Sequence, residues 1–440
     1  MFDGALLGPR RLIFSLVFVA ACVSFADPAG SITQGVVDSA CAGGNGTVIS
    51  VPPSWLAGAA SIATEMLPHG VTLVVASAGY PATSSALADA FTPDCAPDRA
   101  FGSDGVKRLA FGGQAFSIAA AIPAPGGGTI LAGSTPKGWL VARLRASGSL
   151  DPAFGSGGWT VLPWPGSASA IAVTPSGDIV LGGSQGGGCC VREWVGELNA
   201  AGGIVSEFGS GGRSPIPVYR DDSGITRVWA EPDGDILALT AGGNMGFWGI
   251  SISALTSSGS PVPSFQSNFT AAMRRVSPSG IFVGDVVVRS AGFLLIGTEQ
   301  STCVAGPSRT AQGRIVAFQP DGQLERGFAV NGEASFNSPM AQTVWALPRS
   351  NGQFVMAAAP PDIQTNPHAR AELSLFDFSA DGNIDHAFGN NGVADLQLPY
   401  LSQAFPASYV PVTIATNGQV SALVTSTANG QALRLIQLSC

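Results

Sequence analysis

The chain is poor in charged side chains and in the residues that usually bind metals. Only 11% of its 440 residues are Asp, Glu, Lys or Arg, and its net charge is −8. A phosphate backbone requires clustered positive charge, and no run of Lys or Arg exceeds two residues, so we expect no nucleic-acid partner. The three histidines, His69, His368 and His386, lack the spacing of metal ligands. We therefore expect no metal, no cofactor and no catalytic residues.

Long apolar runs are missing as well. The run Leu12–Ala21 follows two arginines and is shorter than the roughly 20 apolar residues that a bilayer span needs. We expect a signal peptide over residues 1–26 and no transmembrane segment in the mature chain. Alternatively, Val19–Cys22 resembles a bacterial lipobox, which gives a lipoprotein signal over residues 1–21 and a lipid anchor at Cys22. The expected location is secreted or periplasmic, or else that of an outer-membrane lipoprotein.

Glycine and proline, in contrast, are abundant. The chain has 58 Gly and 31 Pro, together with 45% hydrophobic residues. This composition is typical of many short strands joined by tight turns and not of long helices. The sequence therefore predicts an all-β protein.

A Phe-Gly pair recurs about every 57 residues along the chain. Six residues before each Phe stands a glycine, except in the first copy, where Cys95 takes its place. The Phe positions are Phe101, Phe154, Phe208, Phe265, Phe328 and Phe388, of which Phe265 and Phe328 are followed by Gln and Ala. Such a fixed period indicates a repeat protein.

A second glycine precedes a short apolar strand in each unit, as in Gly128-Thr-Ile-Leu and Gly234-Asp-Ile-Leu. Between the two signals, each unit reads as four short strands, which we name A, B, C and D in chain order. One such unit cannot bury both faces of its sheet, so neighbouring units must stack. We predict a seven-bladed β-propeller with four antiparallel strands per blade over residues 46–440, after a leader segment at residues 27–45.

The two ends of the chain predict how the ring is closed. The last unit has no strand D, and a spare strand, Thr47–Val51, precedes the first strand A. This N-terminal strand is expected to complete the last blade, which removes an exposed sheet edge. Cys41 precedes the donated strand and Cys440 ends the last strand C, so we predict a Cys41–Cys440 disulfide. The sequence leaves open the partners of Cys95, Cys189, Cys190 and Cys303.

The units resemble the delta-60 repeat β-propeller family of bacterial proteins. The segment Val141–Gly158 carries the best match, Asp381–Gly392 is a second good copy, and the resemblance covers about residues 46–440. The resemblance implies the propeller fold in a bacterial exported repeat protein. It implies no general activity and no site.

Loop lengths predict which face binds a ligand. The C–D turns keep one length, whereas the B–C and D–A segments vary, and in a propeller these two share one rim. We expect binding residues on this rim, namely Arg192, Glu193, Tyr219, Arg220, Asp221, Asp222 and Tyr400.

These observations predict a monomeric, exported, non-enzymatic binding or scaffold module of the bacterial cell envelope or exterior, with an unknown protein or glycan ligand. The alternative is a propeller hydrolase or lyase with its site in the central channel. The strand A segments bear on this choice because they line the channel. They are mostly Ala, Ile, Val and Trp, with Arg227, Glu231 and Asp285 as exceptions.

Overall fold

The computed structural model describes residues 36–37, 47–48, 61–77, 84–186, 191–216, 223–244, 247–276, 281–289, 291–299, 311–338, 343–348, 352–359, 371–398, 412–414, 420–426 and 432–439. The predictions for both signal alternatives and for the Cys41–Cys440 disulfide lie outside these residues. No helix among the described residues combines the length and the apolar composition needed to cross a membrane.

Six antiparallel sheets of three or four strands, each consecutive in the chain, make up most of the structure. The first three are β3 (Ser61–Met66), β4 (Thr72–Ser77), β5 (Ala86–Phe91) and β6 (Val106–Leu109); β7 (Ser117–Pro123), β8 (Thr129–Thr135), β9 (Gly138–Leu144) and β10 (Trp159–Leu162); β11 (Ser167–Val173), β12 (Ile179–Gln185), β13 (Arg192–Leu198) and β14 (Arg213–Ile216). The next three are β15 (Ser223–Ala230), β16 (Ile236–Asn244) and β17 (Phe247–Leu255); β18 (Ile281–Arg289), β19 (Gly292–Glu299), β20 (Ala311–Phe318) and β21 (Glu333–Ser338); β22 (Thr343–Pro348), β23 (Phe354–Ala359), β24 (Ala371–Phe378) and β25 (Val393–Leu398).

A further sheet joins the two ends of the chain. It contains β26 (Val412–Ile414), β27 (Val420–Ser426) and β28 (Ala432–Ser439). Two short N-terminal strands, β1 (Val36–Val37) and β2 (Thr47–Val48), pair antiparallel with β28. The pairing of Thr47 and Val48 with the last strand is the one that the sequence predicts.

The predicted A–B turns are tight hairpin connections. Gly177 and Gly234 have φ angles of 92° and 94°, in the left-handed region that glycine enters without steric cost. Thr174 N–H and Glu231 N–H close these turns on the carbonyls of Asp178 and Asp235. The turn glycines therefore mark strand ends because the turns need a left-handed backbone conformation.

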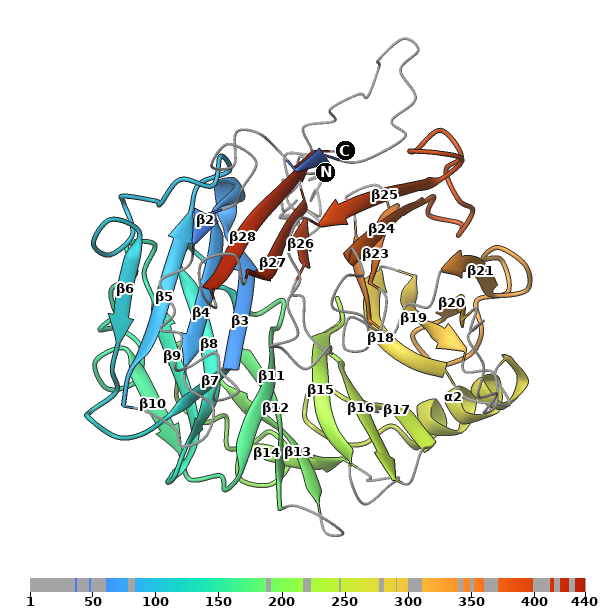
Figure 1. Ribbon diagram of the computed structural model, residues 1–440. Helices are drawn as coiled ribbons and strands as arrows, with labels where there is room; N and C mark the ends of the chain where they lie inside the picture. The colour runs from blue at the N-terminus through green and yellow to red at the C-terminus, as the bar shows by residue number, and fades with distance from the viewer. Residues whose placement is uncertain are drawn as a thin grey trace, which may run out of the picture.

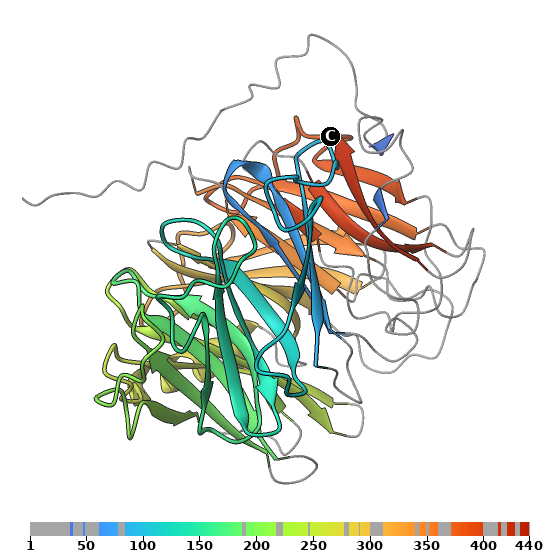
Figure 2. The ribbon, with the colours of Figure 1, turned by 90° about the vertical axis from the view of Figure 1, so that its left-hand side faces the viewer.

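Successive sheets pack face to face around a common centre. Each large apolar cluster combines residues of two neighbouring sheets: one joins Leu73 and Val75 to Leu131 and Leu140, and equivalent clusters follow along the chain. The first strands contact one another, as β3 does β7 and β11 does β15, and Figure 1 shows β3, β11, β15 and β18 nearest the centre. Figure 2 shows the stacked sheets from the side. This arrangement is that of a β-propeller.

The repeated Phe ring fills a pocket beside the C–D turn of the next sheet. Phe101, Phe154 and Phe208 are almost completely buried. A Cβ added at Gly148 would lie 2.7 Å from Cζ of Phe101, and one at Gly202 would lie 2.8 Å from Cζ of Phe154. Burial of each ring contributes about 1.5–3 kcal/mol. The two repeated residues therefore form one contact between consecutive units.

A backbone hydrogen bond accompanies each of these contacts. The N–H of Gly102 donates to the carbonyl of Ser147 at 2.9 Å, and that of Gly155 to Ala201 at 2.8 Å. The same bond recurs from Gly209 to Ser258 and from Ala329 to Asp381. Each acceptor immediately precedes the turn glycine of the following unit, so the bond ties one unit to the next.

The prediction of four strands in every unit is wrong for the fourth sheet. A helix, α2 (Pro263–Val276), takes the place of strand D after β17. In the other units the residue after Phe takes a positive φ, such as 59° at Gly102 and 39° at Ala329, which turns the chain into strand D. The fourth unit has Gln266 there, and its apolar residues Phe265, Phe269, Ala272 and Val276 follow a helical period and are buried.

The helix retains both contacts of the repeat. Phe265 is buried against the turn of Gly322, where a Cβ would lie 2.8 Å from the carbonyl oxygen of Phe265. The side-chain amide of Asn268 donates to the carbonyl of Asp321 at 2.9 Å. Because Asp321 precedes Gly322, a side-chain amide here replaces the backbone N–H used in the other units.

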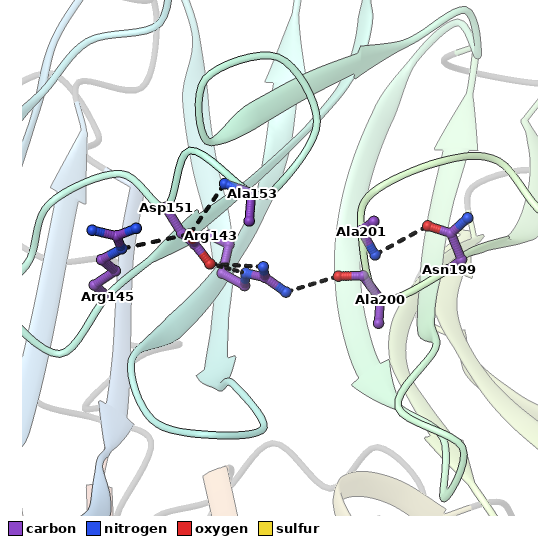
Figure 3. A network of polar contacts seen from close by, with 7 residues as sticks. All are labelled: Arg143, Arg145, Asp151, Ala153, Asn199, Ala200 and Ala201. Atoms are coloured by element: carbon purple, nitrogen blue, oxygen red, sulfur yellow. Dashed lines mark hydrogen bonds and ion pairs between the residues drawn. The ribbon is translucent and has the colours of Figure 1, made fainter.

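Two arginines reinforce the same junctions. Arg143 donates from Nε to Asp151 Oδ2 at 2.7 Å and from Nη1 to the carbonyl of Ala200 in the next sheet at 2.8 Å (Figure 3). Its guanidinium also lies 5.2 Å from the centroid of the Phe154 ring. Arg289 repeats this arrangement with Glu325, Phe328 and the carbonyl of Ala380. Arg143 lies on a strand C and Arg289 on a strand A, so two different strands supply the same contact.

Candidate functional site

The inner strands carry a recurrent β-bulge. The register shifts between Ile118 and Ala120 in β7, and at the equivalent places in β11, β15 and β18. A bulge redirects the side chains that follow it. In β15 the shift leaves Thr226 and Arg227 exposed on a strand that lies at the centre of the molecule. In β18 the residue after the bulge is Asp285.

Two charged residues of the inner strands, Arg227 and Asp285, are in contact at this centre. Arg227 Nε lies 3.8 Å from Asp285 Oδ1, with 51% of the arginine side chain exposed and 14% of the aspartate. Asp285 also accepts hydrogen bonds from the N–H of Val286 at 2.8 Å and of Ala346 at 3.0 Å. The positive charge of Arg227 acts on Glu65, in β3, as well. Arg227 and Asp285 thus connect two sheets, and the charge of Arg227 also reaches a residue of a third sheet.

Desolvation dominates the electrostatics of the two carboxyl groups. It raises the pKa of Glu65 to about 8, against the smaller lowering effects of the Met66 backbone and of Arg227. It also raises the pKa of Asp285, again opposed by Arg227 and by the two backbone N–H donors. Glu65 therefore holds its proton at neutral pH and adds no negative charge, so that Asp285 is the acidic group in contact with Arg227.

This arrangement can donate hydrogen bonds to an anion. The Arg227 guanidinium is planar with several N–H donors, and its long contact to Asp285 together with a 3.3 Å bond to the carbonyl of Thr226 occupies few of them. Protonated Glu65 adds an O–H donor. A carboxylate is the simplest group that matches such a donor set. Asp285 also has a structural role, because the hydrogen bond that it accepts from the N–H of Ala346 links two sheets.

The rim residues predicted from the sequence are only partly described. Arg192 is exposed at the start of β13, whereas Glu193 is 1% exposed, as alternation along a strand requires. Tyr219, Arg220, Asp221, Asp222 and Tyr400 lie outside the described residues. The rim site stays a prediction, and buried Glu193 offers no charge to a ligand at the surface.

Three charged residues were expected among the apolar strand A segments. Of these, Arg227 and Asp285 are in contact, whereas Glu231 lies elsewhere. Glu231 follows β15 and is 5% exposed beside the A–B turn, where desolvation, Asp233 and Asp235 raise its pKa to about 7. Glu65 was missed by the sequence reasoning. The signal was present, because Glu65 is an acidic residue on a predicted strand A.

A shallow hollow of about 250 Å³ lies beside Arg143, Arg145 and Asp151. Its charges satisfy one another, since Asp151 also accepts from the N–H of Ala153 at 3.2 Å and lies 3.5 Å from Arg145 Nε (Figure 3). The Ala153 N–H first, and Arg143 and Arg145 next, hold the pKa of Asp151 below its ordinary value. Among the described residues, no group of three His, Cys, Asp or Glu side chains could hold a metal ion.

The arrangement of repeated antiparallel sheets defines a class, the all-β propeller proteins. No protein-family model and no curated protein matches the chain. Solved structures that resemble it include polysaccharide lyase Uly1, with 12% identity and a TM-score of 0.44 over 86% of this chain and 89% of that one. Sqt1 from Chaetomium thermophilum has 14% identity and a TM-score of 0.42 over 83% and 79%. Prolyl oligopeptidase B from Galerina marginata has 11% identity and a TM-score of 0.40 over 85% and 49%. Similarity at this level assigns neither a family nor an activity.

Proposed function

We propose that the chain is an exported, non-enzymatic binding module of the bacterial cell envelope or exterior, which holds a carboxylate-bearing ligand in its central channel. The observation that carries this proposal is the half-exposed Arg227 guanidinium in contact with Asp285 on the innermost strands, with Glu65 within the range of its charge. The proposed location is secreted or periplasmic, or the outer membrane through a lipid anchor at Cys22. The scaffold is proposed to be a monomeric, seven-bladed propeller of the delta-60 repeat type, closed by its N-terminal strand.

Pairings and contacts between the two ends of the chain support the proposed closure. The described part of the N-terminal strand, Thr47 and Val48, pairs with Leu435 and Arg434 of the last strand. The inner strand β26 contacts β3 of the first sheet on one side and β22 on the other. The last sheet therefore has neighbours on both sides, as closure requires.

The binding proposal is tested by calorimetric titration with D-glucuronate, with D-glucose as the neutral control. We expect binding of the acid only, and a loss of at least about tenfold in affinity in Arg227→Met, because a hydrogen bond to a charged group contributes about 1.5–3 kcal/mol. Arg192→Met, on the predicted rim, is the matched control and should bind normally. Equal affinity of Arg227→Met and the unchanged protein would rule out the proposed channel site. A loss of affinity in Arg192→Met would instead favour a binding site on the rim.

A hydrolase or lyase in the central channel is the second candidate. The observation in its favour is the pKa of Glu65, since a carboxyl group protonated at neutral pH can act as a general acid. The variant Glu65→Gln separates the two candidates. In a binding module it keeps a donor and binds D-glucuronate normally, whereas in an enzyme it abolishes turnover of acidic glycosides while binding persists.

A further inference from the structure

The junction between the last and the first sheet uses different residues from the other junctions. Elsewhere a Phe ring packs against a turn glycine of the next unit, as Phe101 does at Gly148 and Phe328 at Gly382. In the first unit the turn position belongs to Cys95, which has a φ of 61°, is 1% exposed and takes part in a disulfide. Its N–H donates to Thr92, as the N–H of Gly148 donates to Arg145. Cys95 therefore occupies the place of the glycine.

The strand register identifies the residue that occupies the place of Phe. In the second unit Leu144 pairs with Thr129 on one side and with Leu150 on the other, and Phe154 follows four residues after Leu150. The same count leads from Ile204 to Phe208 and from Leu324 to Phe328.

In the last sheet the residue that corresponds to Leu144 is Leu438. It pairs with Val420 on one side and with Val37 on the other. Four residues after Val37 stands Cys41.

The second N-terminal strand gives the same answer independently. Thr160 pairs with Val141, three residues before Leu144, and follows Phe154 by six residues. Thr47 pairs with Leu435, three residues before Leu438, and follows Cys41 by six residues. Counted along the sequence from two separate registers, Cys41 therefore corresponds to the Phe of the other units.

We propose that Cys41 and Cys95 form a disulfide that replaces the Phe–Gly contact and covalently closes the ring. The backbones at this type of junction approach closely, because a Cβ at Gly259 would lie 2.8 Å from the backbone nitrogen of Gly209, next to Phe208. A disulfide needs such proximity. This pairing would replace the Cys41–Cys440 bond expected from the sequence, since Cys440 lies two residues beyond Leu438, at the position of Ala146.

Formation of the bond is a two-electron oxidation. The thiols of Cys41 and Cys95 lose two protons and two electrons to an external disulfide of the thiol–disulfide oxidoreductase class, which is reduced to two thiols. The reduced junction would have neither a phenylalanine side chain nor a covalent link between the two units. Closure of the ring would therefore depend on an oxidising compartment.

Peptide mapping of the unreduced full-length protein tests the pairing directly, and the expected product is a peptide that links Cys41 to Cys95. The variants Cys41→Ser and Cys95→Ser should each lower Tm by on the order of 5 °C, as a closed loop of about 54 residues implies, and the double variant should lower it no further. A linked peptide that joins Cys95 to any other cysteine would overturn the proposal.

A second variant tests the equivalence without sulfur. The double substitution Cys41→Phe with Cys95→Gly restores the residue pair of the other junctions. We expect its Tm to exceed that of the double serine variant, and to fall less than that of the unchanged protein when a phosphine reductant is added. A Tm no higher than that of the double serine variant would show that the two cysteines do not occupy these positions.

Discussion

At the scale of single residues, the turn glycines meet two separate requirements. Gly148 has a φ of 74°, and an added Cβ would also lie 2.7 Å from the ring of Phe101. Gly113 has a φ of 72°, but nothing lies within 4 Å of its added Cβ. Both positions require a backbone with positive φ. Only Gly148 also requires the absence of a side chain, because the Phe101 ring occupies the space.

The substitutions Gly148→Ala and Gly113→Ala therefore separate backbone strain from packing. We expect Gly113→Ala to lower the free energy of unfolding by about 1–2 kcal/mol, the cost of a left-handed Ala. Gly148→Ala should lower it by about 1–3 kcal/mol more, because the neighbouring ring must move. Urea denaturation of both variants measures the difference. Equal losses would mean that Phe101 adapts without cost.

Glu65 should make stability depend on pH. Its pKa of about 8 in the folded protein exceeds the ordinary glutamate value of 4.5, so the folded state binds more protons than the unfolded state between these pH values. Stability should fall as pH rises from about 4.5 to 8. Glu65→Gln should flatten this fall and stabilise the protein by up to about 4 kcal/mol at pH 8, since each pKa unit corresponds to about 1.36 kcal/mol.

Thermal unfolding from pH 5 to pH 8 measures this effect, with Glu207→Gln, an exposed turn residue, as the control. An unchanged pH profile in Glu65→Gln would show that another group is responsible.

The sequence could predict the turn glycines, because they recur at a fixed spacing. It could not predict the state of Glu65, because burial and Arg227, far away in the chain, set that state.

At the scale of elements, α2 shows how a repeat can keep its contacts while changing its secondary structure. The spacing of the Phe anchors predicts a strand after Phe265, but the local sequence favours a helix. Pro263 suits a first helical turn, and Phe265, Phe269 and Ala272 lie on one helical face. In this unit the local apolar pattern, and not the period of the repeat, determines the secondary structure.

The bond from Asn268 to Asp321 has a measurable contribution. We expect Asn268→Ala to lower the free energy of unfolding by about 1 kcal/mol or somewhat more, because it removes a hydrogen bond between units. Ser267→Ala, next to it on the exposed side of the helix, should change stability by less than about 0.5 kcal/mol. Equal effects of the two variants in urea denaturation would show that the bond between units contributes nothing.

At the scale of the whole molecule, the repeat predicted the stacked antiparallel sheets and the pairing of Thr47 and Val48 with the last strand, whereas the count of seven blades stays a prediction. The proposed pairing of Cys41 with Cys95 could not come from the sequence alone, because its argument depends on the register of two short strands on β28. The outer edge of β28 pairs only with these strands among the described residues. The N-terminal segment therefore protects the edge of the last sheet.

Deletion of residues 27–50 should expose this edge. We expect a lower Tm and self-association through β28, because an unpaired edge strand is a template for pairing with another chain. Differential scanning fluorimetry and light scattering after size-exclusion chromatography measure the two effects, with a deletion of residues 1–26 as the control. A deletion variant that stays monomeric with an unchanged Tm would show that the N-terminal strands do not stabilise the ring.

The docking of each Phe into the turn of the following unit has a consequence for how such chains change in length. Loss of a whole unit of about 57 residues removes one ring and one receiving turn together, so the units on either side remain matched. Loss of half a unit leaves a ring without a pocket or a turn without a ring. Insertion and deletion are therefore tolerated best in whole repeats, because the number of units can vary while the Phe–Gly contacts between the remaining units are kept.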